Sequence, residues 1–372
     1  MLYFLILCYN ILRIHESLRP LPCMASARRR QNGRSPAVSH SVARLRAAFQ
    51  KGGTDLHFRF LGKYVIQTVI TLTGISFIMF AITMLGTEDL ARQIITGAED
   101  AVVSQEQIDA VTRELGLDQP FFVQFGHWML NAVQGDLGFS YMARKPVVDK
   151  ILESLPATLS LAALSLFLMT LLSLPLGILS AYHRNRLPDF LIRGVTFFGI
   201  SIPSFWLGLM LLWFFGLKLG LFPIVSSTIR WDTVFLPALT LAISMTAKYT
   251  RQVRSAVLEE LGQDYVMGAR ARGMSELRIL LREVLPNALL PLVTLYGLSI
   301  GSLLGGAAVV EIVFGWQGLG LLAVKAIEYR DIRLLQGIVV WIAGMYMLIN
   351  MLVDLSYALL DPRLRRKEVS HG

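Results

Sequence analysis

The sequence predicts an all-α, polytopic membrane protein with six transmembrane helices. Of its 372 residues, 54% are hydrophobic and only 16% are charged, whereas soluble domains carry roughly 25% charged residues. The apolar residues are gathered into six runs, and charged segments separate them. This composition excludes a soluble enzyme. The net charge of +9 comes from basic residues outside the apolar runs, so membrane orientation explains it better than nucleic-acid binding does.

The first apolar run, residues 64–85, has over twenty residues without a charge, enough to cross a hydrocarbon core of about 30 Å. Residues 1–63 hold eleven basic and two acidic residues, whereas residues 86–153 hold five basic and eleven acidic ones. Because basic segments favour the cytoplasmic side, we expect the N-terminus inside and residues 86–153 outside. Residues 1–57 have the composition of a disordered basic extension.

The other five spans are expected at residues 157–181, 190–217, 234–249, 288–314 and 334–360. The short loop at residues 182–189 carries two arginines, and the chain ends in a basic segment. Both are therefore expected in the cytoplasm, which gives a topology with the two ends inside.

Two spans contain candidate residues of a translocation path. Pro203 lies within the third span, and because it lacks an amide hydrogen we expect either a pore-lining bend or a structural kink there. The fifth span is rich in small residues, which let helices approach closely and could equally line a path. The candidate path residues are Pro203, Ser204, Trp206, Ser299 and Ser302.

An aromatic pattern marks the external region. Aromatic residues recur at helical spacing between Phe121 and Trp128 in an otherwise polar segment. This pattern is typical of an amphipathic helix that lies on the membrane surface or packs on the rest of the protein, and we favour packing.

The most polar stretch of the second half is residues 251–286, which lies between two apolar runs. Residues 263–272 are helix formers, Gly273 can adopt the left-handed conformation that ends a helix, and Ser275 is placed to cap the next helix. We therefore expect two short helices around a glycine turn. So long a polar passage is more than a connection between spans requires, which favours a docking site.

Residues 264–273, DYVMGARARG, are followed after nine residues by a segment ending in Leu285 and Pro286. This spacing resembles the cytoplasmic signature loop of ABC importer permeases, in the variant typical of dipeptide, oligopeptide and nickel permeases. The usual Glu is missing at Met267, and Glu283 stands where the general signature has Ile. Four further segments resemble markers of the same family, namely residues 116–120, 135–138, 155–159 and 314–320. In the last segment, Gln317 stands where the marker usually has Pro.

The resemblance covers residues 58–367, with residues 368–372 as a tail, and implies the ABC importer type I permease fold in a bacterial inner membrane. It implies that the loop at residues 251–286 couples to ATPases. It also implies as partners a second permease subunit, two ATP-binding subunits or domains and an external substrate-binding protein. The coupling residues by this resemblance are Gln263, Asp264, Tyr265, Met267, Gly268, Ala269, Arg272 and Gly273.

No phosphate-binding loop is present, because the one Gly-Lys pair lacks its Gly-rich context. We therefore expect no bound cofactor and no enzymatic activity, with ATP hydrolysed by partners. The candidate substrates are short peptides or nickel. We expect the nickel to be chelated rather than a free ion, because a free ion favours imidazole ligands and all six histidines lie outside the spans. A secondary active transporter is the alternative. It would need ionisable residues near the bilayer midplane, and Asp354, in the last span, lies near its cytoplasmic end.

Overall fold

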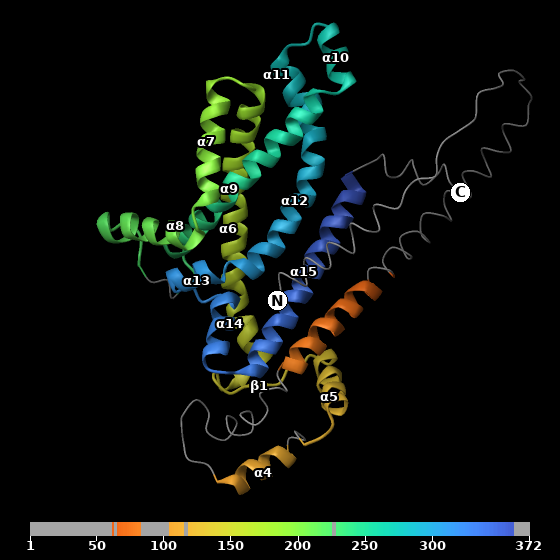
Figure 1. Ribbon diagram of the computed structural model, residues 1–372, viewed down its shortest axis with the longest axis vertical. Coiled ribbons are helices and arrows are strands. Elements are labelled where there is room, and N and C mark those ends of the chain that lie inside the picture. Colours follow the sequence, from red (N-terminus) through yellow and green to blue (C-terminus); the bar gives the residue numbers. More distant parts are fainter. Residues whose placement is uncertain (1–61, 63–64, 83–103, 115–117, 225–227, 361–372) are drawn as a thin grey trace, which may run out of the picture. The chain divides into compact units, whose positions relative to one another are not determined.

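A computed structural model describes residues 62, 65–82, 104–114, 118–224 and 228–360 (Figure 1). Residues up to Ile75 form one unit and residues from Ser76 onward form another, and all labelled elements belong to the second. The predicted extension at residues 1–57 and the C-terminal tail lie outside the described residues.

Almost every described segment is helical, as predicted. The first helix covers Val65–Ile82. The labelled elements are α4 (Gln105–Glu114), α5 (Phe121–Val133), β1 (Phe139–Ser140), β2 (Lys145–Pro146), α6 (Val147–Tyr182), α7 (Leu187–Ser201), α8 (Ser204–Leu211), the π-helix η1 (Leu212–Lys218), α9 (Trp231–Leu261), α10 (Asp264–Ala271), α11 (Glu276–Ile279), the π-helix η2 (Leu280–Val284), α12 (Leu285–Gly306), α13 (Ala308–Phe314), α14 (Leu319–Glu328) and α15 (Ile332–Leu360).

Among the described residues, three helices are long and apolar enough to cross a membrane, namely Val65–Ile82, α6 and α15 through Val353. Two bent helix pairs could each form a further span. Helix α6, with 36 residues, is about 54 Å long at 1.5 Å per residue. It begins ten residues before the predicted second span, so its first turns extend beyond a hydrocarbon core of about 30 Å.

The third predicted span, residues 190–217, is broken at Pro203, where the sequence predicted a bend or a kink. Helix α7 ends at Ser201, the next helix begins at Ser204, and the two segments are bent by 100°. The cause is Pro203, which restricts the preceding residue to extended conformations, and Ile202 has φ −86° and ψ 122°.

The fifth predicted span is also shorter than expected, because α12 ends at Gly306. Residues 308–314, assigned to that span, form α13, which is bent by 85° relative to α14. The turn between α13 and α14 uses Gly315, whose φ of +63° is left-handed. A non-glycine residue would be strained in that conformation.

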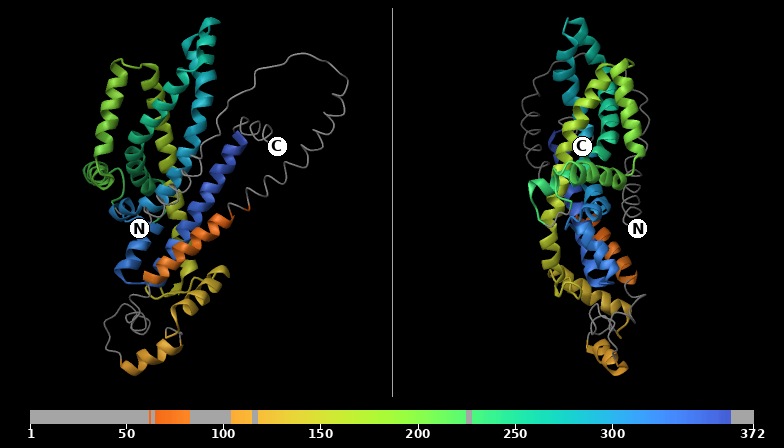
Figure 2. Two further views of the ribbon diagram at one scale, coloured as in Figure 1. Left: turned by 45° about the vertical axis from the view of Figure 1, so that its right-hand side comes forward. Right: turned by 90° about the vertical axis from the view of Figure 1, so that its left-hand side faces the viewer.

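Helices α6 and α9 run side by side through the second unit (Figure 1 and Figure 2). Between them lies a hydrophobic core that also takes side chains from α12 and α13. Leu161 of α6, Leu236 of α9 and Phe314 of α13 are nearly inaccessible members of this core. The α6–α7 loop and α10 lie toward one end of the unit, and the β1–β2 hairpin and α14 toward the other.

Helix α5 packs by its aromatic face, which confirms packing over a free position on the membrane surface. The rings of Phe121 and Phe125 lie 5.4 and 5.5 Å from that of Phe80, edge to face. Trp128 of the same face is buried. Edge-to-face ring pairs at this distance stabilise packing beyond the area that they bury.

Small residues of α12 allow close approach to α15. A Cβ atom added at Gly297 would lie 2.1 Å from Val353 Cγ2, and one added at Gly301 would lie 2.1 Å from the Tyr346 ring. Both distances are far below van der Waals contact. At these two positions, therefore, the small residues serve helix packing.

We predict that Gly301→Ala lowers the thermal unfolding temperature of the detergent-purified protein. The added methyl group would force α12 and α15 apart, and overpacking of this kind costs about 1–3 kcal/mol. Gly344→Ala on α15 is the matched control, because a Cβ there meets nothing within 4 Å. Equal unfolding temperatures for the two variants would contradict the packing.

Candidate functional site

Helix α10 ends in a hydrogen-bonded glycine cap, as the sequence predicted. Gly273 has φ +78°. Its N–H donates to the Arg270 carbonyl at 2.9 Å, and the N–H of Met274 donates to the Ala269 carbonyl at 3.3 Å. These two bonds form a Schellman motif, which satisfies carbonyls at the helix end and fixes the direction of the chain after it.

The start of α11 differs from the expectation in one detail. Ser275 is the N-cap residue, but its side chain makes no capping hydrogen bond. Across the turn, the side chains of Arg270 and Glu276 form a bidentate ion pair at 2.7 and 3.1 Å. Because both side chains are about half exposed, this pair contributes little stability on its own, and the glycine cap provides the main constraint.

The inner face of α10 is buried. Val266 is fully inaccessible and Ala269 is 1% exposed. They belong to a hydrophobic cluster, the coupling cluster, whose buried members are Ala181, Val253, Val257, Val266, Ala269, Ile279, Leu280, Val284, Ala288 and Leu292. These residues come from α6, α9, α10, α11, η2 and α12. The packed cluster therefore fixes α10 to three long helices.

The outer face of α10 is open. Met267 is 64% exposed, and Asp264 and Arg272 are exposed beside it. A Cβ atom at Gly268 would meet only the Arg272 Nη1 atom, at 3.7 Å. A second molecule could therefore approach the backbone of this helix closely at Gly268.

The eight predicted coupling residues divide between these two faces. Gln263, Asp264, Met267, Arg272 and Gly273 are exposed, Gly268 and Tyr265 are half-buried, and Ala269 is buried. Ala269 can therefore position the helix but cannot touch a partner. The coupling role of all eight residues stays a prediction.

Tyr265 joins α10 to the end of α9. Its hydroxyl donates to Glu260 Oε2 at 2.7 Å. Burial, together with this carboxylate, raises the pKa of Tyr265 to about 12. The phenol therefore stays protonated and remains a donor throughout the physiological range.

A buried ion pair lies next to the coupling cluster. Asp189, in the first turn of α7, is fully inaccessible. Arg254 of α9 donates from Nε and Nη2 to its two carboxylate oxygens, each at 2.8 Å. Ser180 of α6 donates to Oδ1 at 2.6 Å, and the Asn185 N–H donates to Oδ2 at 2.9 Å. This arrangement, the inner clamp, ties α6, α7 and α9 together with every carboxylate oxygen satisfied.

A second buried carboxylate, Glu311 of α13, organises the turn before α14. It is 1% exposed, and its Oε2 accepts the Leu321 N–H at 2.8 Å. A Cβ at Gly318 would lie 2.3 Å from Glu311 Oε1, so only glycine fits there. Thr158 of α6 accepts the Leu319 N–H at 2.7 Å and donates to Glu311 Oε1 at 3.4 Å. The sequence markers at residues 155–159 and 314–320 are therefore parts of one contact.

A third buried carboxylate, Asp331, anchors the β1–β2 hairpin to α15. Its Oδ2 accepts the Ser140 hydroxyl at 2.7 Å and the Met142 N–H at 3.0 Å. Its Oδ1 accepts the Leu334 N–H at 3.0 Å, as an N-cap does. The marker at residues 135–138 precedes this hairpin, and Gly138 has φ +92°. The sequence analysis named none of Asp189, Glu311 and Asp331 as site residues.

The candidate path residues are not gathered in one place. Pro203 lies at the break before α8, and Ser204 and Trp206 lie on α8, where Trp206 is 47% exposed. Ser299 of α12 is buried and donates to the Leu295 carbonyl at 2.6 Å. The side chains of Ser302 and Asp354 lie outside the described residues. The path role of these residues stays a prediction.

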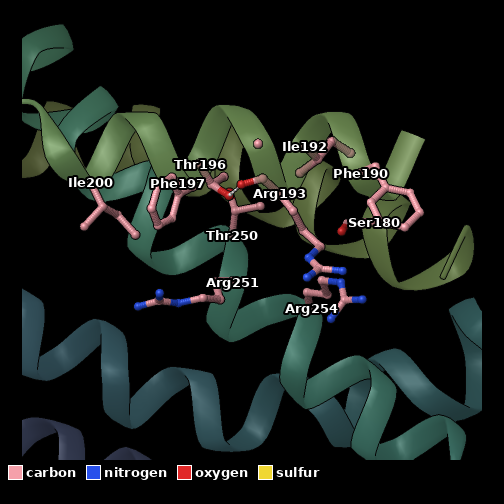
Figure 3. Close-up of a pocket in the computed structure, with 11 residues that line it drawn as sticks. Ser180, Phe190, Ile192, Arg193, Thr196, Phe197, Ile200, Thr250, Arg251 and Arg254 are labelled. Carbon is pink, nitrogen blue, oxygen red and sulfur yellow. Dashed lines mark hydrogen bonds between the residues drawn. The ribbon is translucent and has the colours of Figure 1, made fainter. Parts of the chain in front are cut away.

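One pocket, of about 610 Å³, lies between α7 and α9 (Figure 3). It is lined by residues of these helices and by Ser180, and none of the predicted path residues is among them. Within the part of the chain that the structure describes, no group of three or more His, Cys, Asp or Glu side chains could hold a metal ion.

Two family descriptions match this chain. "Binding-protein-dependent transport system inner membrane component" matches residues 173–366. The corresponding N-terminal description, for the membrane component of such systems, matches residues 57–162. The matches cover residues 251–286, the residues of the inner clamp, and the two sequence markers, residues 155–159 and 314–320, that meet in the buried contact above.

Known proteins resemble the chain over most of its length. The glutathione transport system permease protein GsiC of Escherichia coli O6:H1 (strain CFT073) is 40% identical over 308 residues, which are 82% of this chain and 99% of that protein. GsiC of Shigella dysenteriae serotype 1 is 39% identical over the same length. A solved inward-facing structure of the MetNI methionine ABC transporter is similar with a TM-score of 0.50 and 19% identity, covering 57% of this chain and 96% of that one.

We predict that Asp189→Ala strongly destabilises the protein, because it leaves Arg254 without its carboxylate in a largely buried position. Breaking a buried pair by removing one partner costs about 3–5 kcal/mol, and thermal unfolding in detergent measures this loss. Glu153→Ala is the matched control, because Glu153 pairs with Lys145 and Lys150 at the exposed start of α6. If both variants unfolded at the same temperature, the inner clamp would contribute no more to stability than the exposed ion pairs of Glu153 do.

Proposed function

Since this chain belongs to the family of binding-protein-dependent transport system inner membrane components, we propose that α10 is the segment through which an ATPase partner drives it. The protein is a multi-pass inner-membrane permease subunit of an ABC importer, and importers of this kind work with ATPase and substrate-binding partners. This assignment replaces the secondary transporter considered from the sequence. The proposed assembly adds a second permease subunit, two ATP-binding subunits or domains and one external binding protein.

The observation that carries the proposal is the contrast between the two faces of α10. Its inner face is packed into the coupling cluster, and its outer face presents Asp264, Met267 and the bare backbone of Gly268. An exposed helix that is held rigidly at both ends can transmit a displacement to the helices that it packs against, whereas a flexible loop would deform instead.

The transmission route follows the packed residues. Movement of α10 acts on Val253 and Val257 of α9 through the coupling cluster. Arg254, between them on α9, acts on α7 and α6 through the inner clamp. Closure of the ATPases would therefore tilt α6, α7 and α9 together, and alternating access to the path is the expected result. In this proposal the chain binds no ATP and catalyses no reaction.

The proposed substrates are short peptides. The support is the 40% identity to a permease named for glutathione, which is a tripeptide. Residues 183–190 also resemble a segment of nickel permeases. This resemblance supports nickel only weakly, because the segment includes Asp189, whose carboxylate is fully used in the inner clamp. Chelated nickel remains the second candidate, to be decided by uptake.

We predict that Gly268→Trp and Asp264→Arg each abolish uptake while the permease stays folded and inserted. Both changes lie on the open face of α10, so they obstruct docking without disturbing the coupling cluster. Uptake of labelled peptide by cells and the amount of permease in the membrane fraction are the two measurements.

The control for Gly268→Trp is Gly126→Trp. Gly126 lies on α5, and a Cβ there meets nothing within 4 Å. This variant should transport at least half as well as the wild type. Normal uptake by both α10 variants would refute the docking role, and equal loss in the Gly126 variant would show that the effect is not specific to α10.

We predict that deletion of the gene lowers uptake of labelled glutathione or dipeptide at least tenfold and leaves uptake of free nickel ions unchanged. The measurement is uptake of each labelled solute by the deleted strain and by the same strain carrying the gene on a plasmid. Nickel is supplied with and without histidine as a chelator. Loss of chelated nickel uptake with normal peptide uptake would make the second candidate the substrate.

A further inference from the structure

The pocket between α7 and α9 combines positive charge with apolar walls. Its lining includes the arginines Arg193, Arg251 and Arg254, the hydroxyl residues Ser180 and Thr250, and apolar side chains of α7. Figure 3 shows the Arg193 and Arg254 side chains directed toward the end of the pocket where Ser180 lies, with the apolar side chains of α7 along its length. None of these residues belongs to α10 or to the predicted path.

The charge of the pocket is not balanced by the described residues. Of its three arginines, Arg254 is paired with Asp189. Arg193 and Arg251 have no ion-pair partner among the residues that the structure describes, and the Arg193 guanidinium lies 5.8 Å from the centre of the Phe190 ring. Both arginines line the pocket without a carboxylate partner, and Figure 3 shows the Arg251 side chain directed toward the end of the pocket opposite to that of Arg193.

A buried hydroxyl on the pocket wall also lacks a partner. Thr250 is 1% exposed, and its Oγ1 atom has no hydrogen-bond partner in the described structure. Leaving a buried polar group unsatisfied is costly, and most such groups in native proteins have a protein, water or ligand partner. A hydroxyl donor beside guanidinium groups suits an oxygen-rich anion.

The remaining walls suit a hydrocarbon chain. Phe190 is 58% exposed and Phe197 is 70% exposed, and Ile192 and Ile200 add further apolar side chains to the lining. An inorganic anion would leave this surface bare. An amphiphile, with an anionic head at the arginines and a chain along α7, would cover it.

The position of the pocket matches the depth of a lipid headgroup. It extends along α7 from Phe190 to Ile200, and the end with Phe190 and Ser180 is next to the loop at residues 182–189, which carries Arg184 and Arg186. Basic loops mark the cytoplasmic side of a membrane protein, and basic pockets between helices on that side suit anionic headgroups. We propose that this pocket binds one anionic phospholipid of the inner leaflet, with its phosphate at Arg193 and Thr250 and with Arg251 adding positive charge along the same pocket.

The test uses the assembled importer, purified in detergent with its partner subunits. Native mass spectrometry titrates phosphatidylglycerol and, separately, phosphatidylcholine, and gives the affinity of each retained lipid. The double variant Arg193→Gln/Arg251→Gln removes the unpaired charges. Arg184→Gln/Arg186→Gln removes equal charge from the neighbouring exposed loop and is the matched control.

We expect the wild type and the control to prefer phosphatidylglycerol, and the Arg193/Arg251 variant to bind it on the order of thirtyfold more weakly. Thr250→Val should weaken phosphatidylglycerol binding without a change of charge. Equal affinity in the wild type and the Arg193/Arg251 variant would overturn the proposal. Displacement of the lipid by excess transported peptide, lost in the same variant, would also overturn it and assign the pocket to the solute. Neither outcome depends on the role of α10.

Discussion

The inner half of this permease depends on the burial of one carboxylate. Asp189 has no access to solvent and accepts four hydrogen bonds, two from Arg254 and one each from Ser180 and the Asn185 backbone. A buried charge is tolerable only when it is paired and fully hydrogen-bonded, so the three helices that supply these donors must keep their relative positions. Because α9 also carries Val253 and Val257 into the coupling cluster, α10 and the inner clamp form one mechanical body.

The opposite end of the protein, with α14 and the β1–β2 hairpin, also contains two buried, hydrogen-bonded carboxylates. Glu311 and Asp331 are buried carboxylates that accept backbone N–H groups at the start of α14 and α15. Helix ends away from water need such partners, since the membrane supplies none. Each carboxylate also binds a hydroxyl from a distant segment, Thr158 or Ser140. Short helices and a hairpin are thereby attached to the long helices α6 and α15.

The sequence predicted local features of the coupling loop well, because their causes are local. The left-handed Gly273 and the helix before it follow from residue type and spacing alone, and a family signature marked them. The all-α membrane class followed equally from composition. A disturbance of the helix at Pro203 was also predicted, but the bend of 100° was not, because proline in an apolar run does not set the angle at which the chain leaves it.

The buried carboxylates escaped sequence analysis for a different reason. Arg254 is 65 residues from Asp189, and Ser140 is 191 residues from Asp331, so no short motif records either contact. Glu311 stands in an apolar segment just before a glycine-rich turn. An acidic residue in such a segment was the one sequence signal that could have indicated a buried carboxylate. Only the packed structure shows that its partners include backbone N–H groups. The distribution of coupling residues over two faces of α10 likewise required the structure.

The central claim is that the outer face of α10 contacts an ATPase, and site-directed cross-linking tests it most directly. Met267, which is 64% exposed, would be changed to Cys in a chain whose Cys8 and Cys23 are replaced by Ser. The assembled importer would carry single cysteines in its ATPase. A short bifunctional thiol reagent would then be applied. We expect a specific permease–ATPase cross-link from Met267→Cys and none from Phe122→Cys, a position on α5 that is 75% exposed. Absence of a cross-link from Met267→Cys at every ATPase position, with the importer intact, would contradict it.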